Sequence, residues 1–302
     1  MELCYCHHLI FTINVGDDLD RISIVLPAKN EGAALKNLLP RLRQQHPQAE
    51  IIVVDDGSTD NTRELCEQNG VDCLSSPYAM GNGAAIKRGA RAAKGDVLVF
   101  MDADDQHDPA DIQRLLTKLD EGYDMVVGAR DWSGQASASR GMANAFYNWL
   151  ASRITGFEVA DLTSGFRAVR ASKFREFIYL LPNGFSYPTT STMAFFRSAY
   201  AVAYMPIKVS QRVGKSHIKP FRDGLRFLLI IFKIATLYSP LKLFVPASVI
   251  FFLLGLGHYA YTFITLHRFT NMSALLFSAG VIVFLIGLIS EQITALTYRR
   301  DG

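Results

Sequence analysis

The chain has 302 residues, of which 49% are hydrophobic and 20% are charged, and its formal net charge is +3. This composition is ample for a packed core, while so mild a charge, with no long run of lysine or arginine, argues against a nucleic-acid partner. The cysteines match neither a disulfide framework nor a paired zinc motif, which indicates a reducing compartment. They are Cys4, Cys6, Cys66 and Cys73.

The first 20 residues are interpreted as an N-terminal leader. They lack a basic start followed by an apolar stretch and a small-residue cleavage site, so they do not read as a secretory signal. The region after them is therefore expected to stay in the cytoplasm. Cys4, Cys6, His7 and His8 could ligate a metal, but no second ligand pair follows, and we favour a poorly ordered leader.

Short strand-like segments alternate with helical patterns between residues 21 and 218. The strand-like segments are Ile22–Leu26, Ile51–Val54, Val97–Met101 and Met125–Val127. This alternation predicts an α/β domain with a mostly parallel sheet, in which ligands bind at the carboxyl ends of the strands. No internal repeat or low-complexity linker interrupts the region, so we expect a single domain over residues 21–218.

Polar motifs follow the first two strands, at residues 27–31 (PAKNE) and 55–60 (DDGSTD). A carboxylate in such a loop can accept hydrogen bonds from a base N–H or from ribose hydroxyls. Each motif alone is weak, because Asp and Gly are common in turns. Asp60 could equally well cap a helix instead of binding a ligand, whereas Asp56 fits the cap interpretation less well.

The third motif carries the sharpest chemistry, because the strand at 97–101 leads directly into residues 102–109 (DADDQHDP). So many acidic groups would repel one another without a cation, and carboxylate and amide oxygens suit Mg²⁺ or Mn²⁺. A helix start, with Asp108 as cap and Pro109 in the first turn, explains only the end of this run. We therefore predict a divalent cation at this loop, where it would neutralise a diphosphate leaving group.

Residues 219–240 are predicted to form an amphipathic helix that lies in a membrane interface. Arg222, Arg226 and Lys233 fall at helical spacing on one face, and the apolar residues lie mostly elsewhere. Pro220 and Pro240 bracket the segment, which suits a helix that turns before and after the interface.

Two membrane spans are predicted after this helix, at residues 241–266 and 273–298. From residue 243 to residue 298 the charged side chains are Arg268 and Glu291, and each apolar run, of about 24 residues, can cross a hydrocarbon core of ~30 Å. Basic residues flank the pair of spans on the outside, whereas the connection between them carries only Arg268 and His267. The positive-inside rule then predicts that both termini and the large N-terminal region lie in the cytoplasm.

Taken together, the motifs resemble glycosyltransferase family 2, in the branch of dolichol-phosphate mannose synthase and bacterial polyprenyl-phosphate glycosyltransferases. The resemblance covers nearly the whole chain after about residue 21. It rests on the order and spacing of segments 25–32, 53–60, 81–85 (GNGAA), 101–109, 161–167 (DLTSGFR) and 212–216 (RVGKS). It implies a Rossmann-like GT-A fold and inversion at the anomeric carbon.

The resemblance also implies roles for individual residues. Those implied to bind the nucleotide-sugar are Pro27, Lys29, Glu31, Asp56, Asp102, Ala103 and Arg130. Those implied to hold Mg²⁺ or Mn²⁺ are Asp102, Asp104 and Gln106. Those implied to bind the acceptor phosphate, for which guanidinium groups are well suited, are Arg140, Arg212 and Ser216. Those implied to act in catalysis are Asp104, Asp161 and Arg212.

The role of Asp161 is left open, and one residue of the acidic loop, Asp105, departs from the family pattern. Asp161 resembles the family's candidate base, but it could equally position the acceptor or cap the turn at residues 163–165. Asp105 stands where relatives often have leucine, and it is expected to point away from the cation.

The implied reaction transfers a hexose from a UDP- or GDP-linked donor to undecaprenyl or dolichyl phosphate at the cytoplasmic membrane face. With a second phosphate pKa of about 6, the acceptor is largely dianionic at neutral pH, so a strong general base is not required. Alternatives are transfer to a hydroxyl of a glycolipid or polysaccharide, and an inactive membrane scaffold that binds nucleotide-sugar. The expected partners are the donor, the acceptor and membrane lipid, and a homo-oligomer is left open.

Overall fold

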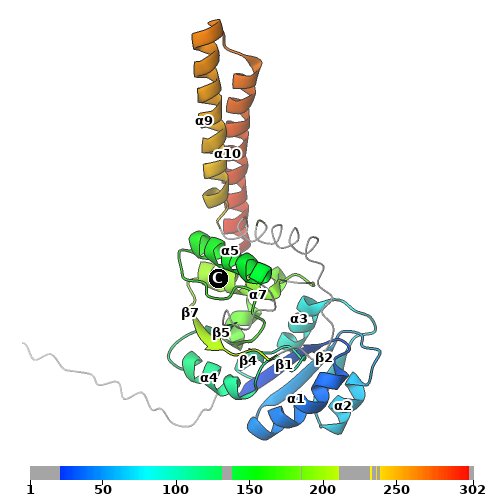
Figure 1. Cartoon of the computed structure of the whole chain (residues 1–302). Helices are drawn as coiled ribbons and strands as arrows, with labels where there is room; N and C mark the ends of the chain where they lie inside the picture. The colour runs from blue at the N-terminus through cyan, green and yellow to red at the C-terminus, as the bar shows by residue number, and fades with distance from the viewer. Residues whose placement is uncertain are drawn as a thin grey trace, which may run out of the picture.

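The computed structural model describes residues 21–130, 138–184, 186–210, 232, 236 and 239–298, without the side chains of residues 138–143, 297 and 298 (Figure 1). The predicted leader and almost all of the predicted interfacial helix lie outside these residues. So do Arg212 and Ser216 and the side chain of Arg140, whose implied roles therefore stay predictions.

Strands and helices alternate along the described chain until it ends in two long helices (Figure 1). The first half contains β1 (Ile22–Ala28), α1 (Gly32–Gln45), β2 (Glu50–Asp55), α2 (Thr62–Gln68), β3 (Asp72–Ser75), α3 (Asn82–Ala92), β4 (Val97–Phe100) and α4 (Ala110–Leu119). The second half contains β5 (Met125–Arg130), α5 (Ala138–Thr155), β6 (Arg167–Arg170), α6 (Ala171–Arg175), the 3₁₀ turn η2 (Ile178–Leu180), α7 (Tyr187–Arg197), β7 (Val202–Ile207), α9 (Pro240–Leu266) and α10 (Asn271–Tyr298).

The seven described strands form one sheet in the order β3-β2-β1-β4-β6-β5-β7. Neighbouring strands are parallel except at β6, which runs antiparallel to both β4 and β5. The predicted mostly parallel α/β fold is therefore confirmed. Because β6 opposes both of its neighbours, β4 and β5 point the same way, and the carboxyl ends of β1, β2, β4 and β5 lie along one edge of the sheet.

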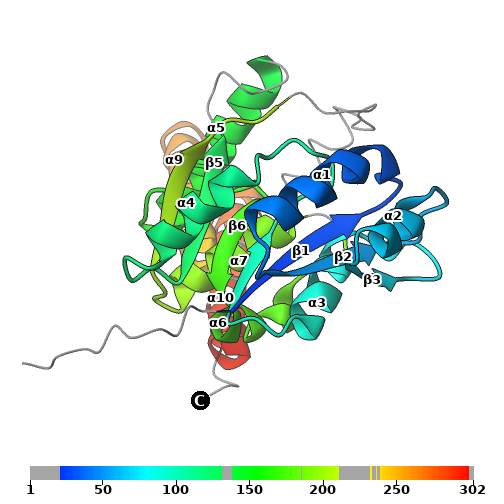
Figure 2. The ribbon, with the colours of Figure 1, turned by 90° about the horizontal axis from the view of Figure 1, so that it is seen from below.

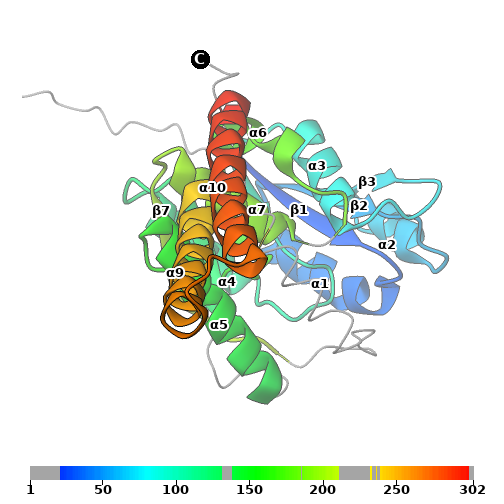
Figure 3. The same ribbon diagram turned by 90° about the horizontal axis from the view of Figure 1, so that it is seen from above.

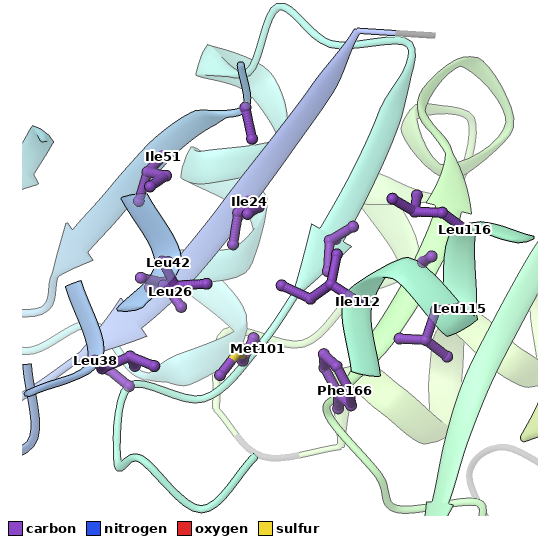
Figure 4. Close-up of a cluster of buried hydrophobic side chains, with 14 of the residues drawn as sticks. Ile24, Leu26, Leu38, Leu42, Ile51, Met101, Ile112, Leu115, Leu116 and Phe166 are labelled. Carbon is purple, nitrogen blue, oxygen red and sulfur yellow. The ribbon is translucent and has the colours of Figure 1, made fainter. Parts of the chain in front are cut away.

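Alternate side chains of the central strands enter two buried clusters, one on each face of the sheet. Ile24 and Leu26 of β1 pack with α1 and α4, as Figure 4 shows. Val25, between them, packs with α3, α6 and α7 on the opposite face, and both helical layers can be seen from below (Figure 2). A strand that is covered on both faces reads as a continuous apolar run, which is why β1, β2 and β4 are recognisable in the sequence.

Three strands lack this signal and are not predicted from the sequence. β3 is a partly exposed edge strand of sequence DCLS, and β6 reads RAVR, with an arginine at each end. β7 contains Pro206, which weakens a strand pattern. β3 and β6 are therefore too short or too polar to be distinguished from loops by their pattern alone, and in β7 the proline argues against a strand.

The helices α9 and α10 pair as a hairpin, and each is long and apolar enough to cross a membrane (Figure 1). Only 17% of each apolar window is buried, which fits membrane spans better than the core hairpin of a soluble protein. Both helices begin slightly earlier than predicted, at Pro240 and Asn271. Small residues allow the two helices to approach closely, since Ser248 Oγ donates a hydrogen bond to the Gly280 carbonyl at 2.7 Å.

The contact of α3 with the sheet gives a test of the fold. A Cβ added to Gly89 would overlap Val25 Cγ1 and lie 3.1 Å from Val54 Cγ2, both on rigid β-branched side chains of central strands. Gly89→Ala should therefore lower the melting temperature by a few degrees, although alanine normally stabilises a helix interior by about 1 kcal/mol relative to glycine. Gly257→Ala in α9, where a Cβ meets nothing within 4 Å, is the matched control and should cause no loss. Equal melting temperatures for the two variants, measured by circular dichroism, would contradict this packing.

Candidate functional site

The loops after β1 and β2 hold each other at the carboxyl edge of the sheet. Asn30, at a positive φ of 55°, receives a hydrogen bond from the Thr59 amide at 2.8 Å and donates its own amide proton to Ser58 Oγ at 2.9 Å. The first two sequence motifs therefore form one surface. Three residues of the first motif are implied to bind nucleotide. Pro27 and Glu31 are half-buried, and Lys29 is exposed.

Both acidic residues of the second motif that sequence analysis singled out have structural contacts. The two carboxylate oxygens of Asp56 accept the amide protons of Met80 at 2.6 Å and Gly81 at 2.8 Å, which fixes the turn before α3. Each oxygen keeps a lone pair, so a role for Asp56 in binding a nucleoside stays a prediction. Asp60 accepts the amide protons of Gly32 at 2.9 Å and of Thr62, the first residue of α2, at 3.1 Å, whereas the N-cap position of this helix is held by Asn61.

The acidic loop after β4 begins with a carboxylate that lies against a glycine. Asp102 is half-buried, whereas Ala103 and Asp104 are buried. A Cβ on Gly165 would come 3.1 Å from an Asp102 oxygen and 3.1 Å from the Tyr187 hydroxyl, which donates to the Gly165 carbonyl at 2.9 Å. Glycine at position 165 is therefore what lets the turn before β6 approach this carboxylate.

The later acids of this loop face α1. Asp105 and Asp108 each accept a hydrogen bond from the Arg41 guanidinium at 3.0 Å, and Asp105 has a positive φ of 57°. This contact agrees with the expectation that Asp105 turns aside. These two carboxylates therefore have a guanidinium as counter-ion, and the roles implied for Asp102 and Asp104 as cation ligands stay predictions.

Gln106 joins the acidic loop to the segment after β7. Its side-chain amide donates to the Ser210 carbonyl at 3.2 Å, and the Ser210 amide donates to the Gln106 carbonyl at 2.9 Å. The Gln106 amide also donates to Asp104 Oδ1 at 3.3 Å. As a ligand Gln106 could use its side-chain oxygen, because its side-chain N–H group is the donor to Ser210. The described residues end at Ser210, two positions before Arg212.

Arg130 and Asp161 form a bidentate ion pair at the end of β5. Arg130 Nε donates to Asp161 Oδ2 at 2.7 Å, and Nη2 donates to Oδ1 at 2.9 Å and to the Thr163 hydroxyl. Asp161 Oδ1 also accepts the amide protons of Thr163 at 3.0 Å and Ser164 at 3.1 Å. The carboxylate thus caps the turn at residues 163–165, as one of the sequence interpretations has it, and fixes the guanidinium at the same time.

These contacts decide which role of Asp161 the geometry favours. Burial raises the pKa of this carboxyl, but the hydrogen bonds and charge of Arg130 outweigh burial and hold the pKa below its ordinary value. The same pairing raises the pKa of Arg130 against the effect of burial. A carboxylate so stabilised is a weak proton acceptor, so the geometry favours positioning of Arg130 over proton abstraction.

Sequence reasoning assigned no role to Arg167, which is fully buried beneath this turn. Its Nη1 donates to Ser191 Oγ at 2.9 Å, Thr192 Oγ1 at 3.1 Å and the Pro188 carbonyl at 3.0 Å. These partners are neutral, and burial lowers the pKa of the guanidinium although the nearby carboxylates Asp161 and Asp102 favour its charge. In the sequence, the only indication of a role for this residue is its place at the end of the segment 161–167. The sequence does not show that the arginine is buried.

His107, the histidine of the acidic loop, is buried and stacks on Phe166 with ring centroids 4.8 Å apart. Burial lowers its pKa to about 4, although the charge of Asp104 acts in the opposite direction. The imidazole is therefore neutral near pH 7 and adds no positive charge beside Asp104.

The donor set of the acidic loop fits a divalent cation that is shared with a ligand. Among the described residues, no group of three His, Cys, Asp or Glu side chains is arranged to hold a metal ion alone. Mg²⁺ does not need such a cage, because it commonly takes one or two carboxylates and completes its shell with water and phosphate. Asp102 and Asp104 supply that number, with the side-chain oxygen of Gln106 nearby in the sequence.

Comparison with sequence families agrees with this geometry. Residues 23–178 match the sequence model of glycosyl transferase family 2, and residues 239–296 match that of the GtrB C-terminal hairpin. The chain belongs to glycosyltransferase family 2. The first match ends in η2, after the acidic loop and the Arg130–Asp161 pair, and the second coincides with α9 and α10.

Relatives and solved structures extend the comparison. The undecaprenyl-phosphate 4-deoxy-4-formamido-L-arabinose transferase of Pseudomonas fluorescens (strain Pf0-1) is 31% identical over 257 residues, which cover 78% of this chain and 70% of the relative. The protein of the same name from Proteus mirabilis is 34% identical over 51% of this chain, and the match spans only 50% of that relative's length. Glucosyl-3-phosphoglycerate synthase from Mycobacterium tuberculosis, in complex with Mn²⁺ and UDP-glucose, superimposes with a TM-score of 0.57 at 21% identity, covering 72% of this chain and 79% of that one. This likeness confirms the predicted GT-A fold.

The ion pair of Arg130 with Asp161 can be tested with a double-mutant cycle. Asp161→Asn and Arg130→Gln should each destabilise the protein, while the double variant should lose less than their sum, with a coupling energy of about 2 kcal/mol. Folding lowers the pKa of Asp161, so its contribution is present at pH values above its ordinary pKa of 3.8 and is lost only as pH falls through the lower folded value. The coupling, measured by denaturant unfolding, should therefore be constant from about pH 5 to pH 8. Additive losses would mean that the pair contributes no net stability.

Proposed function

We propose that the chain transfers a hexose from a UDP- or GDP-linked donor to a polyprenyl phosphate at the cytoplasmic membrane face, with inversion at the anomeric carbon. The observation that carries this proposal is a direct contact between the sheet domain that holds the candidate site and a membrane hairpin. Lys242 Nζ, at the start of α9, donates to the Ile154 carbonyl at the end of α5 at 2.7 Å. An enzyme whose acceptor is dissolved in water has no need for such a connection.

The names of the relatives support the acceptor. They are transferases that act on undecaprenyl phosphate, and one of them matches 78% of this chain. The donor is supported by family membership and by the GT-A fold, whose solved examples include complexes with UDP and Mn²⁺. Pro27, Lys29, Glu31, Asp56, Asp102, Ala103 and Arg130 are proposed to bind the nucleotide-sugar.

Asp102 and Asp104, with Gln106, are proposed to hold Mg²⁺ or Mn²⁺ between themselves and the donor diphosphate. The ion would neutralise charge on the departing nucleoside diphosphate. The Gln106 side chain is hydrogen-bonded to the Ser210 carbonyl, so the acidic loop and the end of the segment after β7 are expected to move together.

Arg130 presents a guanidinium that Asp161 holds in one orientation, which suits the approach of phosphate. The second ionisation of the acceptor, with a pKa of about 6, supplies an anionic nucleophile at neutral pH. Asp161 is therefore proposed to position Arg130 rather than to remove a proton. Arg140, Arg212 and Ser216 complete the proposed acceptor site.

The membrane orientation follows from the charges around the spans. Lys242 lies in the first turn of α9 and Arg299 and Arg300 follow α10, whereas the connection between the helices carries Arg268 and His267. By the positive-inside rule, the sheet domain and both termini are proposed to lie in the cytoplasm.

Removing a cation ligand gives the first functional test. Asp104→Asn keeps the shape of this buried side chain but removes its charge, so transfer should fall about a thousandfold, which corresponds to about 4 kcal/mol of barrier. Excess chelator should abolish transfer by the wild type, and Mg²⁺ or Mn²⁺ should restore it. Asp108→Asn, which removes a charge that faces Arg41, is the matched control and should keep most activity. Unchanged turnover in chelator would exclude the proposed cation.

The product gives the second functional test. Purified full-length protein is incubated with polyprenyl phosphate and a panel of UDP- and GDP-sugars, and the lipid fraction is analysed by mass spectrometry. We expect one donor to yield a lipid heavier by one sugar residue, and we expect the Asp104→Asn variant to yield none. A sugar found on a glycolipid or polysaccharide hydroxyl, with polyprenyl phosphate left unmodified by every donor, would overturn the proposed acceptor.

A further inference from the structure

The helix α5 exposes an aromatic stripe to solvent. Phe146 is 48% exposed and Trp149 is 61% exposed, with ring centroids 5.9 Å apart, and Arg153 is exposed one turn further on. Spacings of three and four residues place these side chains on one face of a helix. Tryptophan and phenylalanine beside arginine is the composition of a helix face that lies at a membrane surface.

The opposite face of α5 is packed against the sheet domain. Ala151 and Ile154 are buried in a cluster with Met193 and Phe196 of α7. The aromatic stripe therefore points away from the domain and does not belong to its core. Figure 3, a view down the hairpin, shows α5 running out from beneath α9 and α10 with no other described element above it.

The hairpin fixes the height of this stripe. Lys242 Nζ binds the Ile154 carbonyl at the end of α5, and Leu243 packs against the same cluster as Ile154. The helix α5 therefore lies at the foot of α9, where the chain enters the membrane (Figure 1). A bilayer that surrounds the hairpin reaches its surface at this level, and Arg153 suits its anionic headgroups.

The inner side of α5 binds the turn that carries Asp161. Asn148 Nδ2 donates to the Ala160 carbonyl at 2.6 Å, and Asn148 Oδ1 accepts the Leu162 amide proton at 3.0 Å. Ser152 Oγ, one turn later, accepts the amide proton of Val159 at 2.9 Å. Asn148 thus binds both neighbours of Asp161, the residue that orients Arg130.

We propose that α5 is a membrane-seated helix whose aromatic stripe, Phe146 and Trp149, enters the bilayer surface and whose Asn148 transmits this seating to the Asp161–Arg130 pair. Trp149 and Asn148 are adjacent in sequence and lie on different sides of one helix, so a shift of α5 moves both. The guanidinium is then held in its binding orientation when the enzyme sits on a membrane that contains its acceptor. Asn148 acts here as a positioning residue. This coupling rests on the proposed function, whereas the seating of α5 does not.

Continuity with the hairpin favours a bilayer over a second copy of the chain as the occupant of the stripe. The stripe is narrow, and the positively charged Arg153 lies beside it. It also adjoins two helices whose apolar surfaces already require lipid. A second copy is treated as an outcome of the test.

The seating is tested by fluorescence. The chain has two tryptophans, so Trp132→Phe leaves Trp149 as the single emitter. The full-length protein is placed in vesicles of phosphatidylcholine and phosphatidylglycerol that carry bromine on the acyl chains near the headgroup. The control carries Trp132→Phe, Trp149→Phe and Gln113→Trp, which puts the emitter at an exposed position of α4, on the opposite face of the sheet.

We expect brominated lipid to quench Trp149 several-fold more than the tryptophan of the control. Equal quenching in the two proteins would overturn the seating. Protection of Trp149 from aqueous iodide that rises with protein concentration in detergent would also overturn it, because that result assigns the stripe to contact between copies.

The coupling is tested by hydrogen exchange of residues 159–164, a measurement that needs no catalysis. Amides of this segment donate to Ser152, Asn148 and Asp161, so their exchange reports how firmly α5 holds the turn. In the wild type, exchange should be several-fold slower in vesicles than in detergent. Trp149→Ser and Asn148→Ala should abolish this difference, while Asn144→Ala, one turn earlier on the same helix, should keep it.

Slowing that survives in both Trp149→Ser and Asn148→Ala would overturn the coupling. If the wild type shows the slowing but transfers no sugar to any polyprenyl phosphate, the proposed function fails and the membrane-linked turn stands. If the protein is active, Asn148→Ala should lower kcat in vesicles with little change in KM for the donor. A merely structural role would instead lower stability equally in vesicles and in detergent.

Discussion

The antiparallel strand β6 is the constraint on which the site depends. It runs against β4 and β5, so it begins at the edge where those strands end, and the turn that carries Asp161 enters the sheet beside Asp102 and Arg130. Without this reversal, the segment 161–166 would emerge at the far edge of the sheet. The close approach of Gly165 to Asp102 and the pairing of Arg130 with Asp161 both follow from it. One topological feature thus gathers the acidic loop and the Arg130 guanidinium in a single place.

The site balances opposite charges at short range, and each group has a distinct task. Arg41 neutralises the outer acids of the acidic loop, and Asp161 fixes Arg130. Arg167 lies fully buried behind them and donates to neutral oxygens, so it adds a fixed positive potential beneath the carboxylates. In the proposed reaction two anionic substrates meet in this site, and the proposed cation, the exposed part of Arg130 and the membrane-proximal basic residues would offset their repulsion.

Much of the fold is predictable from the sequence because its central strands are buried on both faces and read as apolar runs. β6 is not, because RAVR has arginines at both ends. One of them, Arg167, can be buried because oxygens of α7 and the Ser164 carbonyl accept its hydrogen bonds. The loops at the carboxyl edge can be recognised in the sequence as candidate sites, because so many acidic groups in one loop would repel one another without a cation. Their internal pairings are not, because Arg41 and Asp105 are 64 residues apart and meet only through the fold. The sequence places an amphipathic helix after the sheet domain, whereas the exposed aromatic stripe on α5 emerges only when its packed face is known.

In this chain α5 joins a family 2 glycosyltransferase domain to a membrane hairpin, and in the proposed reaction a lipid phosphate oxygen attacks the sugar carbon. The most direct measurement uses polyprenyl phosphate whose terminal oxygens carry a heavy oxygen isotope, followed by mass analysis of both products. We expect that the lipid product retains every labelled oxygen, one of them now bridging to the sugar, and that unlabelled nucleoside diphosphate is released. Release of nucleoside monophosphate with a diphosphate-linked lipid, or a sugar attached elsewhere than to the labelled phosphate, would contradict it.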